Sequence, residues 1–435
     1  MRELARGAGD EVGRRLTERL AAAGDGVGGE ADRLRIARQL LQAWLLAHRE
    51  DCVREGRPRL GSADEEALAQ AVLDRLFGLA GLQRYLDDVS VDNIHINGCD
   101  AVFVDYSGRK VRVPPVADSD EELIDLLRRI AAREGLSERE FSPSSPILDV
   151  TLRDGSRLNA VMSVSDRPAV TIRRHRLLDA TPEELVGVHG LMAAEVCDLL
   201  VAAIRAKQSI VVSGGMGCGK STLVRSLGAV FPPSWRVVTL EDPRELWWDR
   251  QTELHPDCVA LEARHPNLQG EGGISIRDLF TQALRMDADV VVVGEVRSDE
   301  VTPMLNAMSA GSAGGSLCTV HARSALDTFT RLQVLLAQAP ERLGAEAAAA
   351  LIGSAVDLVV HIETDVDRRT GERRRWVDSV REVRGADRGM VVSNEVLRVD
   401  EAGRVLAPAA LSDELRRRLA RAGAELRVVP SEWPA

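Results

Sequence analysis

The sequence lacks the features of a secreted, membrane-spanning or zinc-binding protein. Its six cysteines stand far apart with no C-x-x-C pair, so neither a disulfide framework nor a zinc site is indicated. The N-terminal segment 1–6 has no apolar signal core, and no stretch approaches the roughly 20 apolar residues that are needed to cross a bilayer. These absences predict a protein that stays in the cytoplasm.

Lysine is nearly absent, and the chain is acidic. Lysine occurs only at positions 110, 207 and 220, so arginine carries almost all of the positive charge. A net charge of −11 argues against a polynucleotide as the main ligand, because non-specific binding to nucleic acid needs a positive field. Two arginine clusters, at 173–176 and 373–375, can still each face an anion, although most such runs are solvated surface or hairpin.

One of these lysines lies in a predicted phosphate-binding loop. Residues 214–221 match the pattern G-x-x-x-x-G-K-[ST], and they join the apolar run 209–213 to an apolar-periodic segment. A strand, a tight glycine turn and a helix N-terminus are what a loop that binds phosphate requires. Lys220 is predicted to reach the β- and γ-phosphates, and Ser221 to bind Mg²⁺. The residues predicted to bind the nucleotide are Gly214, Gly215, Met216, Gly217, Cys218, Gly219, Lys220, Ser221 and Thr222.

Hydrophobic periodicity divides the chain into three predicted parts. Residues 1–80 predict a helical N-terminal segment, because apolar side chains recur there at helical spacing. Residues 81–178 predict a small α/β domain with short strands around one helix and a hairpin turn at Asp154-Gly155. Residues 179–435 alternate helix and strand signals, which predicts a mostly parallel sheet with helices on both faces.

The third part contains a regular series of predicted elements. The predicted helices are 191–206, 220–230, 276–286 and 298–310. The predicted strands are 209–213, 236–240, 289–294 and 316–320, and the apolar runs 356–362 and 391–399 are expected to extend the sheet.

Acidic residues and one histidine follow these predicted strands. Glu241 comes directly after 236–240, Glu295 follows 289–294, and His321 ends the last strand signal. Parallel sheets bind ligands at the carboxyl ends of their strands. One carboxylate can hold a magnesium-bound water while the other orients or deprotonates the attacking water. A solvated turn is the alternative for either acidic cluster, and a structural hydrogen bond is the alternative for the histidine.

Taken in order, five segments resemble the motifs of a known family. The P-loop and the segments 239–245, 276–286, 292–297 and 319–322 look like the Walker A, Asp box, pre-Walker B, Walker B and His box of the type II/type IV secretion ATPase superfamily. The CpaF/TadA branch, which powers tight-adherence (Flp-type) pili, is the nearest match. The resemblance implies a C-terminal RecA-like P-loop NTPase domain, preceded by a small α/β, PAS-like domain.

The resemblance also implies an activity and partners. Members form hexamers at the inner face of the cell membrane, hydrolyse ATP with Mg²⁺, and dock on inner-membrane platform proteins to add pilins or move a secreted substrate. By motif, Glu241 would be the general base, Glu295 would assist Mg²⁺ partly through water, and His321 would sense the γ-phosphate. Arg157 and Arg173 match the arginines with which the N-terminal domain of this family closes over the phosphates.

Two departures keep other functions open. The segment 310–316 is one residue longer than its counterpart in the family and lacks its histidine and acidic residue, which motivates a regulatory or scaffolding subunit that binds ATP with negligible turnover. Arg323 also stands where the family usually has asparagine. A conjugative DNA-transfer motor uses the same core, although the acidic charge argues against it.

Overall fold

The computed structural model divides the chain into two compact units, Met1–Arg176 and Leu177–Ala435. Each unit is considered by itself. The structure describes residues 2–23, 30–106, 109–134, 141–152, 154–174, 180–264, 266, 270–311, 315–366, 373–399, 404–407 and 409–423.

Three helices at the start of the first unit share a core of their own. They are α1 (Arg2–Ala23), α2 (Glu30–Arg54) and α3 (Ser62–Leu76). Leu68 and Val72, one helical turn apart on α3, are fully buried in this core, and Val12 of α1 packs into the same cluster. The prediction of a helical N-terminal segment rested on apolar residues at this spacing, and it is confirmed.

A small sheet with its own core forms the rest of the first unit. All of its strands pair antiparallel, in the order β3-β2-β1-β6-β5-β4. Helix α5 (Asp120–Glu134) buries Leu123, Leu127 and Ile130 in the core of this sheet. The predicted hairpin at Asp154-Gly155 is confirmed, since β4 and β5 pair on either side of it. The other elements are η2 (Ala80–Leu82), α4 (Gln83–Asp87), β1 (Asn93–Asn97), β2 (Val102–Tyr106), β3 (Arg109–Val113), β4 (Ile147–Thr151), β5 (Arg157–Val161) and β6 (Ala169–Arg173).

The second unit is built on a nine-stranded mixed sheet in the order β15-β14-β13-β12-β7-β11-β10-β8-β9. The strands from β12 to β9 in this order are parallel, and β13, β14 and β15 add antiparallel pairs at one side. The strands are β7 (Ile210–Gly214), β8 (Val237–Glu241), β9 (Cys258–Glu262), β10 (Val290–Val296), β11 (Leu317–His321), β12 (Leu358–Val366), β13 (Arg373–Asp387), β14 (Met390–Val399) and β15 (Val405–Leu406).

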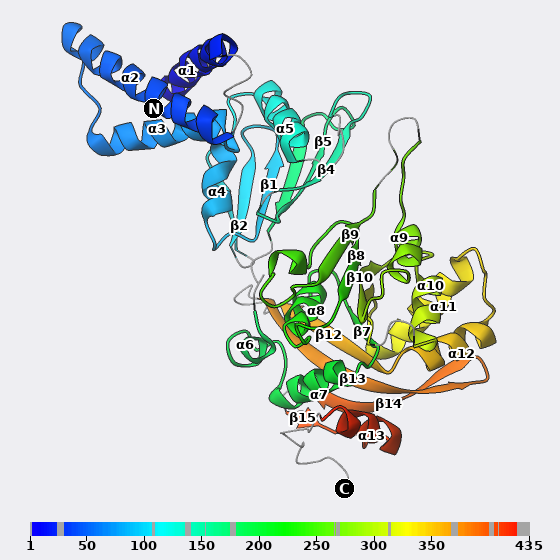
Figure 1. Ribbon diagram of the computed structural model, residues 1–435. Helices are drawn as coiled ribbons and strands as arrows, with labels where there is room; N and C mark the ends of the chain where they lie inside the picture. Colours follow the sequence, from blue (N-terminus) through cyan, green and yellow to red (C-terminus); the bar gives the residue numbers. More distant parts are fainter. Residues whose placement is uncertain are drawn as a thin grey trace. The chain divides into compact units, whose positions relative to one another are not determined.

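Helices cover both faces of this sheet (Figure 1). Successive residues of one strand enter different cores: Val212 of β7 packs with α7, α8 and α13, whereas Val211 packs with helices α9 to α12. This alternation explains the near-continuous apolar strands, because both faces are buried. The helices are α6 (Pro182–Gly187), α7 (Ala194–Arg205), α8 (Lys220–Gly228), η3 (Trp248–Arg250), α9 (Ile276–Ala283), α10 (Val301–Ser309), α11 (Ala325–Gln338), α12 (Ala345–Ala355) and α13 (Asp413–Arg421).

The predicted fold class is confirmed: a mostly parallel α/β sheet flanked by helices follows a small α/β region and a helical segment. Every helix and strand predicted within 191–320 is present, with ends shifted by a few residues. Strands β9 and β13 were not predicted, and in β13 the many charged residues hide the strand pattern. The boundaries placed at 80 and 178 remain predictions. None of the described helices combines the length and apolar composition that a membrane-spanning segment requires.

Candidate functional site

The predicted phosphate-binding loop joins the end of β7 to the start of α8. Gly214, Gly217 and Gly219 have φ angles of 154°, 70° and 104°, which side chains other than hydrogen rarely tolerate. A Cβ atom at Gly214 would also lie 2.5 Å from the carbonyl oxygen of Ile362 on β12. Both the backbone conformation and the close approach of β12 therefore require glycine in this loop.

Lys220 lies inside the loop that precedes it. Its side chain is 7% exposed, and Nζ donates hydrogen bonds to the carbonyl oxygens of Gly214 (3.1 Å) and Gly215 (2.8 Å). The positive end of the α8 dipole lies at the same place, because Lys220 is the first residue of that helix. A buried ammonium group and a helix N-terminus together form a site for a phosphate anion.

Four neighbouring parallel strands bring the predicted polar groups to one edge of the sheet. Strands β7, β11, β10 and β8 are adjacent in this order, and His321 pairs in register with Gly214. Glu295 lies near the end of β10, and Glu241 is the last residue of β8. The carboxyl ends of parallel strands are where such sheets bind ligands.

Lys220, His321 and Glu295 form a continuous chain of polar contacts. Lys220 Nζ lies 3.1 Å from His321 Nδ1, and His321 Nε2 lies 2.6 Å from Glu295 Oε1. An ammonium group has only donors, so Nδ1 must accept and the ring proton belongs on Nε2, whose contact with Glu295 is close but lacks the geometry of a hydrogen bond. Burial and the Lys220 charge lower the pKa of His321, although Glu295 opposes this, so the neutral ring is favoured.

Glu295 has a second partner beyond this chain. Arg297 Nε donates to Glu295 Oε2 at 2.6 Å, while the neutral His321 ring lies against Oε1. Thr319 fixes the adjacent backbone by donating from Oγ1 to the carbonyl oxygen of Gly294 (2.7 Å). The position of Glu295 is therefore set by Arg297, directly after β10, and by His321 and Thr319 of β11.

Glu241 is almost fully buried. Its side chain is 1% exposed, and Oε1 accepts hydrogen bonds from the backbone N–H groups of Glu245 (2.7 Å) and Leu246 (2.9 Å). Burial raises the pKa of Glu241 to about 7, although the two backbone donors act in the opposite direction. Its carboxyl group therefore changes protonation near neutral pH, and it also holds the loop that follows β8.

Glu245 is a site residue that was not predicted from the sequence. Its Oε2 accepts a hydrogen bond from the hydroxyl of Ser221 at 2.6 Å, which places this carboxylate beside the predicted magnesium ligand. The segment 239–245 carries two glutamates four residues apart, and the sequence alone did not distinguish their environments. In the structure Glu241 faces backbone amides, whereas Glu245 faces the loop.

The oxygen donors at this edge suit Mg²⁺. The Ser221 hydroxyl and carboxylates such as Glu245 and Glu295 are hard ligands, and Mg²⁺ usually takes only one or two carboxylates, with water and substrate phosphates as its other ligands. Among the residues that the structure describes, no group of three or more His, Cys, Asp or Glu side chains forms a metal site. This is compatible with an ion that arrives with a nucleotide.

The two predicted arginines of the first unit are direct neighbours. Arg157 on β5 and Arg173 on β6 pair in register, so their side chains leave the same face of the small sheet. The residues beside them on each strand, Leu158 and Ile172, point into the core. The two cations are thus presented together, and their role at a nucleotide stays a prediction.

Two side chains of the loop itself differ sharply in exposure. Met216 is 81% exposed, whereas Cys218 is 1% exposed. Burial raises the pKa of the Cys218 thiol, while the positive charges of Lys220 and Arg375 act in the opposite direction.

The atypical segment 310–316 includes residues 312–314, which lie outside the described residues.

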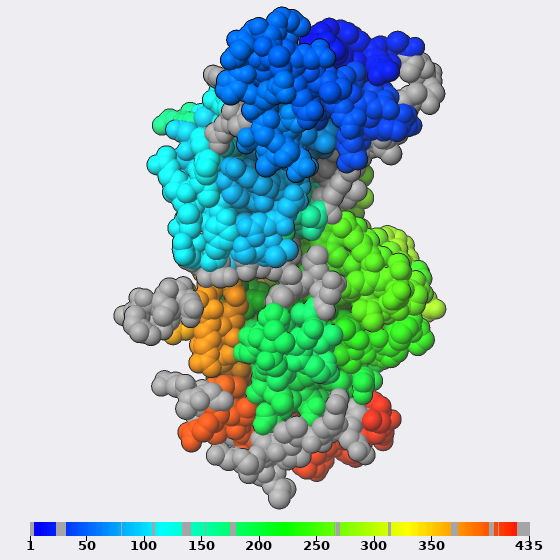
Figure 2. Space-filling model, turned by 90° about the vertical axis from the view of Figure 1, so that its left-hand side faces the viewer, coloured from blue at the N-terminus to red at the C-terminus, as the bar shows by residue number. Residues whose placement is uncertain are grey.

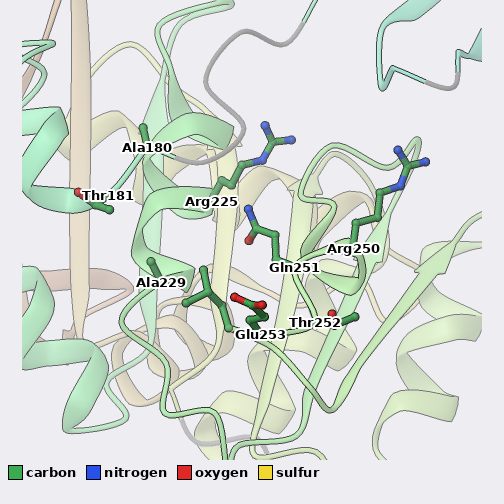
Figure 3. A pocket seen from close by; sticks show the side chains of 9 residues that line it. Ala180, Thr181, Arg225, Ala229, Arg250, Gln251, Thr252 and Glu253 are labelled. Atoms are coloured by element: carbon green, nitrogen blue, oxygen red, sulfur yellow. The ribbon is translucent and has the colours of Figure 1, made fainter.

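A separate pocket of about 440 Å³ lies beside the P-loop helix. Arg225 and Ala229 of α8 contribute to it, but none of the residues 214–222 does. Figure 3 shows the guanidinium groups of Arg225 and Arg250 extending in the same direction, away from the Glu253 carboxylate. The pocket is lined by Ala180, Thr181, Arg225, Ala229, Arg250, Gln251, Thr252, Glu253 and Leu254.

Known proteins with similar sequences belong to conjugation and secretion machinery by name. A putative conjugal transfer protein of Mycobacterium tuberculosis is 30% identical over 326 residues, which cover 72% of this chain and 88% of that protein. The type IV secretion system protein PtlH of Bordetella pertussis is 32% identical over 283 residues, covering 59% of this chain and 80% of that protein.

Solved structures of similar proteins include the VirB11 ATPase of the Brucella suis type IV secretion system in complex with sulphate. It is 26% identical, with 73% of this chain and 96% of that chain covered and a TM-score of 0.36. The sequence also matches the family described as type II/IV secretion system protein over residues 77–406. The predicted superfamily is confirmed, whereas the tight-adherence branch stays a prediction. The chain therefore belongs to the type II/IV secretion system protein family.

Proposed function

We propose that this protein hydrolyses ATP to ADP and phosphate and uses the reaction to drive a secretion or pilus machine. The observation that carries the proposal is the chain from Lys220 through His321 to Glu295, since it links the phosphate loop to two neighbouring strand ends. Such a chain senses the charge of a bound phosphate, because Lys220 must exchange its loop carbonyls for phosphate oxygens when a nucleotide binds.

Each residue has a proposed role in this site. Lys220 binds the β- and γ-phosphates, and Ser221 holds Mg²⁺ with help from Glu295, partly through water. The metal ion would neutralise charge that develops on the phosphates. His321 responds to the γ-phosphate through its contact with Lys220. Arg157 and Arg173 add positive charge from the first unit.

Two glutamates compete for the role of general base. The pKa of Glu241, raised to about 7, suits proton transfer at neutral pH, but this side chain is 1% exposed. Glu245 is more accessible and contacts Ser221, next to where magnesium-bound water would lie. We propose Glu241 as the base predicted by the family motif, and Glu245 as the group that positions the water or replaces Glu241 in this role.

Steady-state ATPase assays with and without Mg²⁺ test the proposal. We expect Lys220→Ala to lower kcat by about a hundredfold or more, because it removes the main phosphate cation. Glu241→Gln and Glu245→Gln should show which carboxylate is the general base. The variant that lacks the base should lose ATPase activity at every pH. Glu253→Gln, which changes an exposed carboxylate in the same segment, is the matched control. Full activity of Lys220→Ala would overturn the site.

The setting proposed for this activity is a homo-hexamer at the cytoplasmic face of the inner membrane. It would act on platform proteins, and through them on pilins or a secreted substrate, as in the tight-adherence branch. The five sequence motifs support this setting. Sedimentation of the purified protein with nucleotide tests the hexamer, and co-purification with a membrane platform protein tests the docking.

A conjugative DNA-transfer motor is the second candidate. The relative from Mycobacterium tuberculosis is named a putative conjugal transfer protein, which favours it. The net charge of −11 favours an indirect role, because a direct motor on DNA needs a positive surface. DNA binding titrated at several salt concentrations distinguishes the two: tight, salt-dependent association supports the DNA motor. Negligible turnover of the wild type, with tight nucleotide binding, would support the regulatory subunit instead.

A further inference from the structure

Strand β13 approaches the phosphate loop because its partner strand β12 is longer than β7. Ile362 of β12 pairs with Gly214, the last residue of β7, and residues 363–366 continue past that point. The start of β13 pairs with this extension, and Arg375 lies opposite Thr364. The end of β12 and the start of β13 therefore extend beyond Gly214, where the phosphate loop begins.

Arg375 uses this position to contact the loop directly. Its Nε donates a 3.0 Å hydrogen bond to the carbonyl oxygen of Gly217, and its Cδ lies 3.9 Å from the position of a Cβ atom on Gly219. Gly217 and Gly219 are two of the residues with positive φ. The arginine thus holds the outer side of the glycine turn.

The strand that carries Arg375 is fixed to the rest of the second unit. The backbone N–H of Val377 donates to the carbonyl oxygen of Leu191 at 2.7 Å, and the Val377 side chain is buried in the core. Figure 2 shows the orange segment of β12 and β13 beside the green segment that contains α6 and α7. Arg375 therefore extends from an anchored strand.

A glycine-rich turn benefits from such a contact. Glycine loses more conformational freedom than other residues when it becomes ordered, so a loop of glycines binds weakly unless it is held in the bound conformation. The guanidinium group also adds a positive charge close to where phosphate oxygens would bind. Its nearest arginine neighbour, Arg374, faces the opposite side of the strand and lies over the ring of Trp376 at 5.3 Å.

We propose that Arg375 is a positioning residue for the nucleotide site, which holds the Gly217–Gly219 turn from outside and so strengthens binding of the nucleotide phosphates. This inference rests on the proposed nucleotide site and adds a cation from the same unit as the P-loop. It assigns a role to the third arginine of the 373–375 cluster.

Binding of a fluorescent ADP analogue with Mg²⁺, measured on the full chain, tests the inference. We expect Arg375→Gln to raise Kd about five- to tenfold, because it removes a hydrogen bond from a charged donor. Arg375→Lys should restore most of the affinity, because its ammonium group can reach the same carbonyl. Arg374→Gln removes the same charge one residue away, and its Kd should stay within about twofold of the wild type.

Kinetics distinguish positioning from a structural loss. We expect Arg375→Gln to raise KM for ATP with kcat nearly unchanged, which is the signature of lost uniform binding. Its melting temperature without nucleotide should match that of Arg374→Gln. Unchanged Kd in Arg375→Gln, or an equal loss in Arg374→Gln, would overturn the role of Arg375. If the wild type itself failed to bind the analogue, the proposed function would fall, and this inference with it.

Discussion

Glu241 is a buried carboxylate whose environment predicts a pH-dependent stability. Its pKa is raised from 4.5 to about 7, chiefly by burial, so the folded state binds a proton more tightly than the unfolded chain. Between these two values the folded state holds more protons, and the free energy of unfolding therefore falls as pH rises. Well above pH 7 the Glu241 carboxylate is charged in the folded state, and the free energy of unfolding is lowered by the full cost of burying that charge.

Glu241→Gln should abolish this pH dependence. The amide keeps an oxygen that can accept from the backbone N–H groups of Glu245 and Leu246. We expect the variant to be more stable than the wild type at pH 8 by on the order of 2 to 3 kcal/mol, and equally stable near pH 4.5. Urea unfolding at both pH values measures the difference. A constant difference, or one matched by the exposed-carboxylate variant Glu253→Gln, would contradict the assignment.

Single residues differ in how well their roles could be read from the sequence. Lys220 was predicted, because its function follows from a local pattern that fixes strand, loop and helix together. Glu245 and Arg375 were missed as site residues. Their contacts with Ser221 and Gly217 depend on how distant segments pack, and no spacing along the chain encodes those distances.

Helix α8 depends on a glycine where it meets η3. A Cβ atom on Gly228 would lie 2.3 Å from Cζ2 of Trp248, whose ring is fully buried and donates from Nε1 to the carbonyl oxygen of Arg225 (3.3 Å). The ring fills the space that a larger residue at 228 would need. Packing of the P-loop helix against the segment after Glu245 therefore relies on this contact.

Gly228→Ala should destabilise the protein by about 2 kcal/mol or more, because the clash is with a buried ring and cannot be relieved by a flexible chain end. Gly187→Ala in α6 is the matched control: no atom lies within 4 Å of its Cβ position. We expect the control to be neutral or stabilising by up to about 1 kcal/mol, since alanine favours helix. Thermal unfolding of both variants compares them, and similar melting temperatures would argue against the packing role of Gly228.

Secondary structure was predictable where burial imposes a regular pattern. The central strands were found because both of their faces are buried, so nearly every residue is apolar. Strand β13 begins with Arg373, Arg374 and Arg375 and lies toward one side of the sheet, where exposed positions tolerate charge. Its strand pattern was hidden because solvent, rather than a core, faces many of its side chains.

No core is shared between the two compact units, and this predicts that each unit unfolds in a transition of its own. Leu127 is fully buried in the core of the small sheet, so Leu127→Ala should lower the free energy of unfolding of the first unit by about 2 to 5 kcal/mol. The transition whose temperature falls in this variant is then the one that belongs to the first unit. A non-hydrolysable ATP analogue with Mg²⁺ should raise the transition of the second unit, which contains the P-loop. Calorimetry of the full chain measures both.

The same experiment tests the arginines of the first unit. If Arg157 and Arg173 contact the bound nucleotide, the analogue must also stabilise the unit that carries them. We expect the first transition to rise in the wild type and to stay constant in the double variant Arg157→Gln/Arg173→Gln. A shift of equal size in both proteins would exclude these residues from the nucleotide site.

The sequence by itself determined the fold class, the phosphate loop and the family, because each rests on local periodicity or on a short motif whose geometry is fixed by neighbouring residues. Only the tertiary structure decided which side chains meet around the loop. It separated a buried Glu241 from a Glu245 that contacts Ser221, joined Lys220 to Glu295 through His321, and brought Arg375 to Gly217. These contacts arise from the order of strands in the sheet and from the overhang of β12, which long-range packing sets.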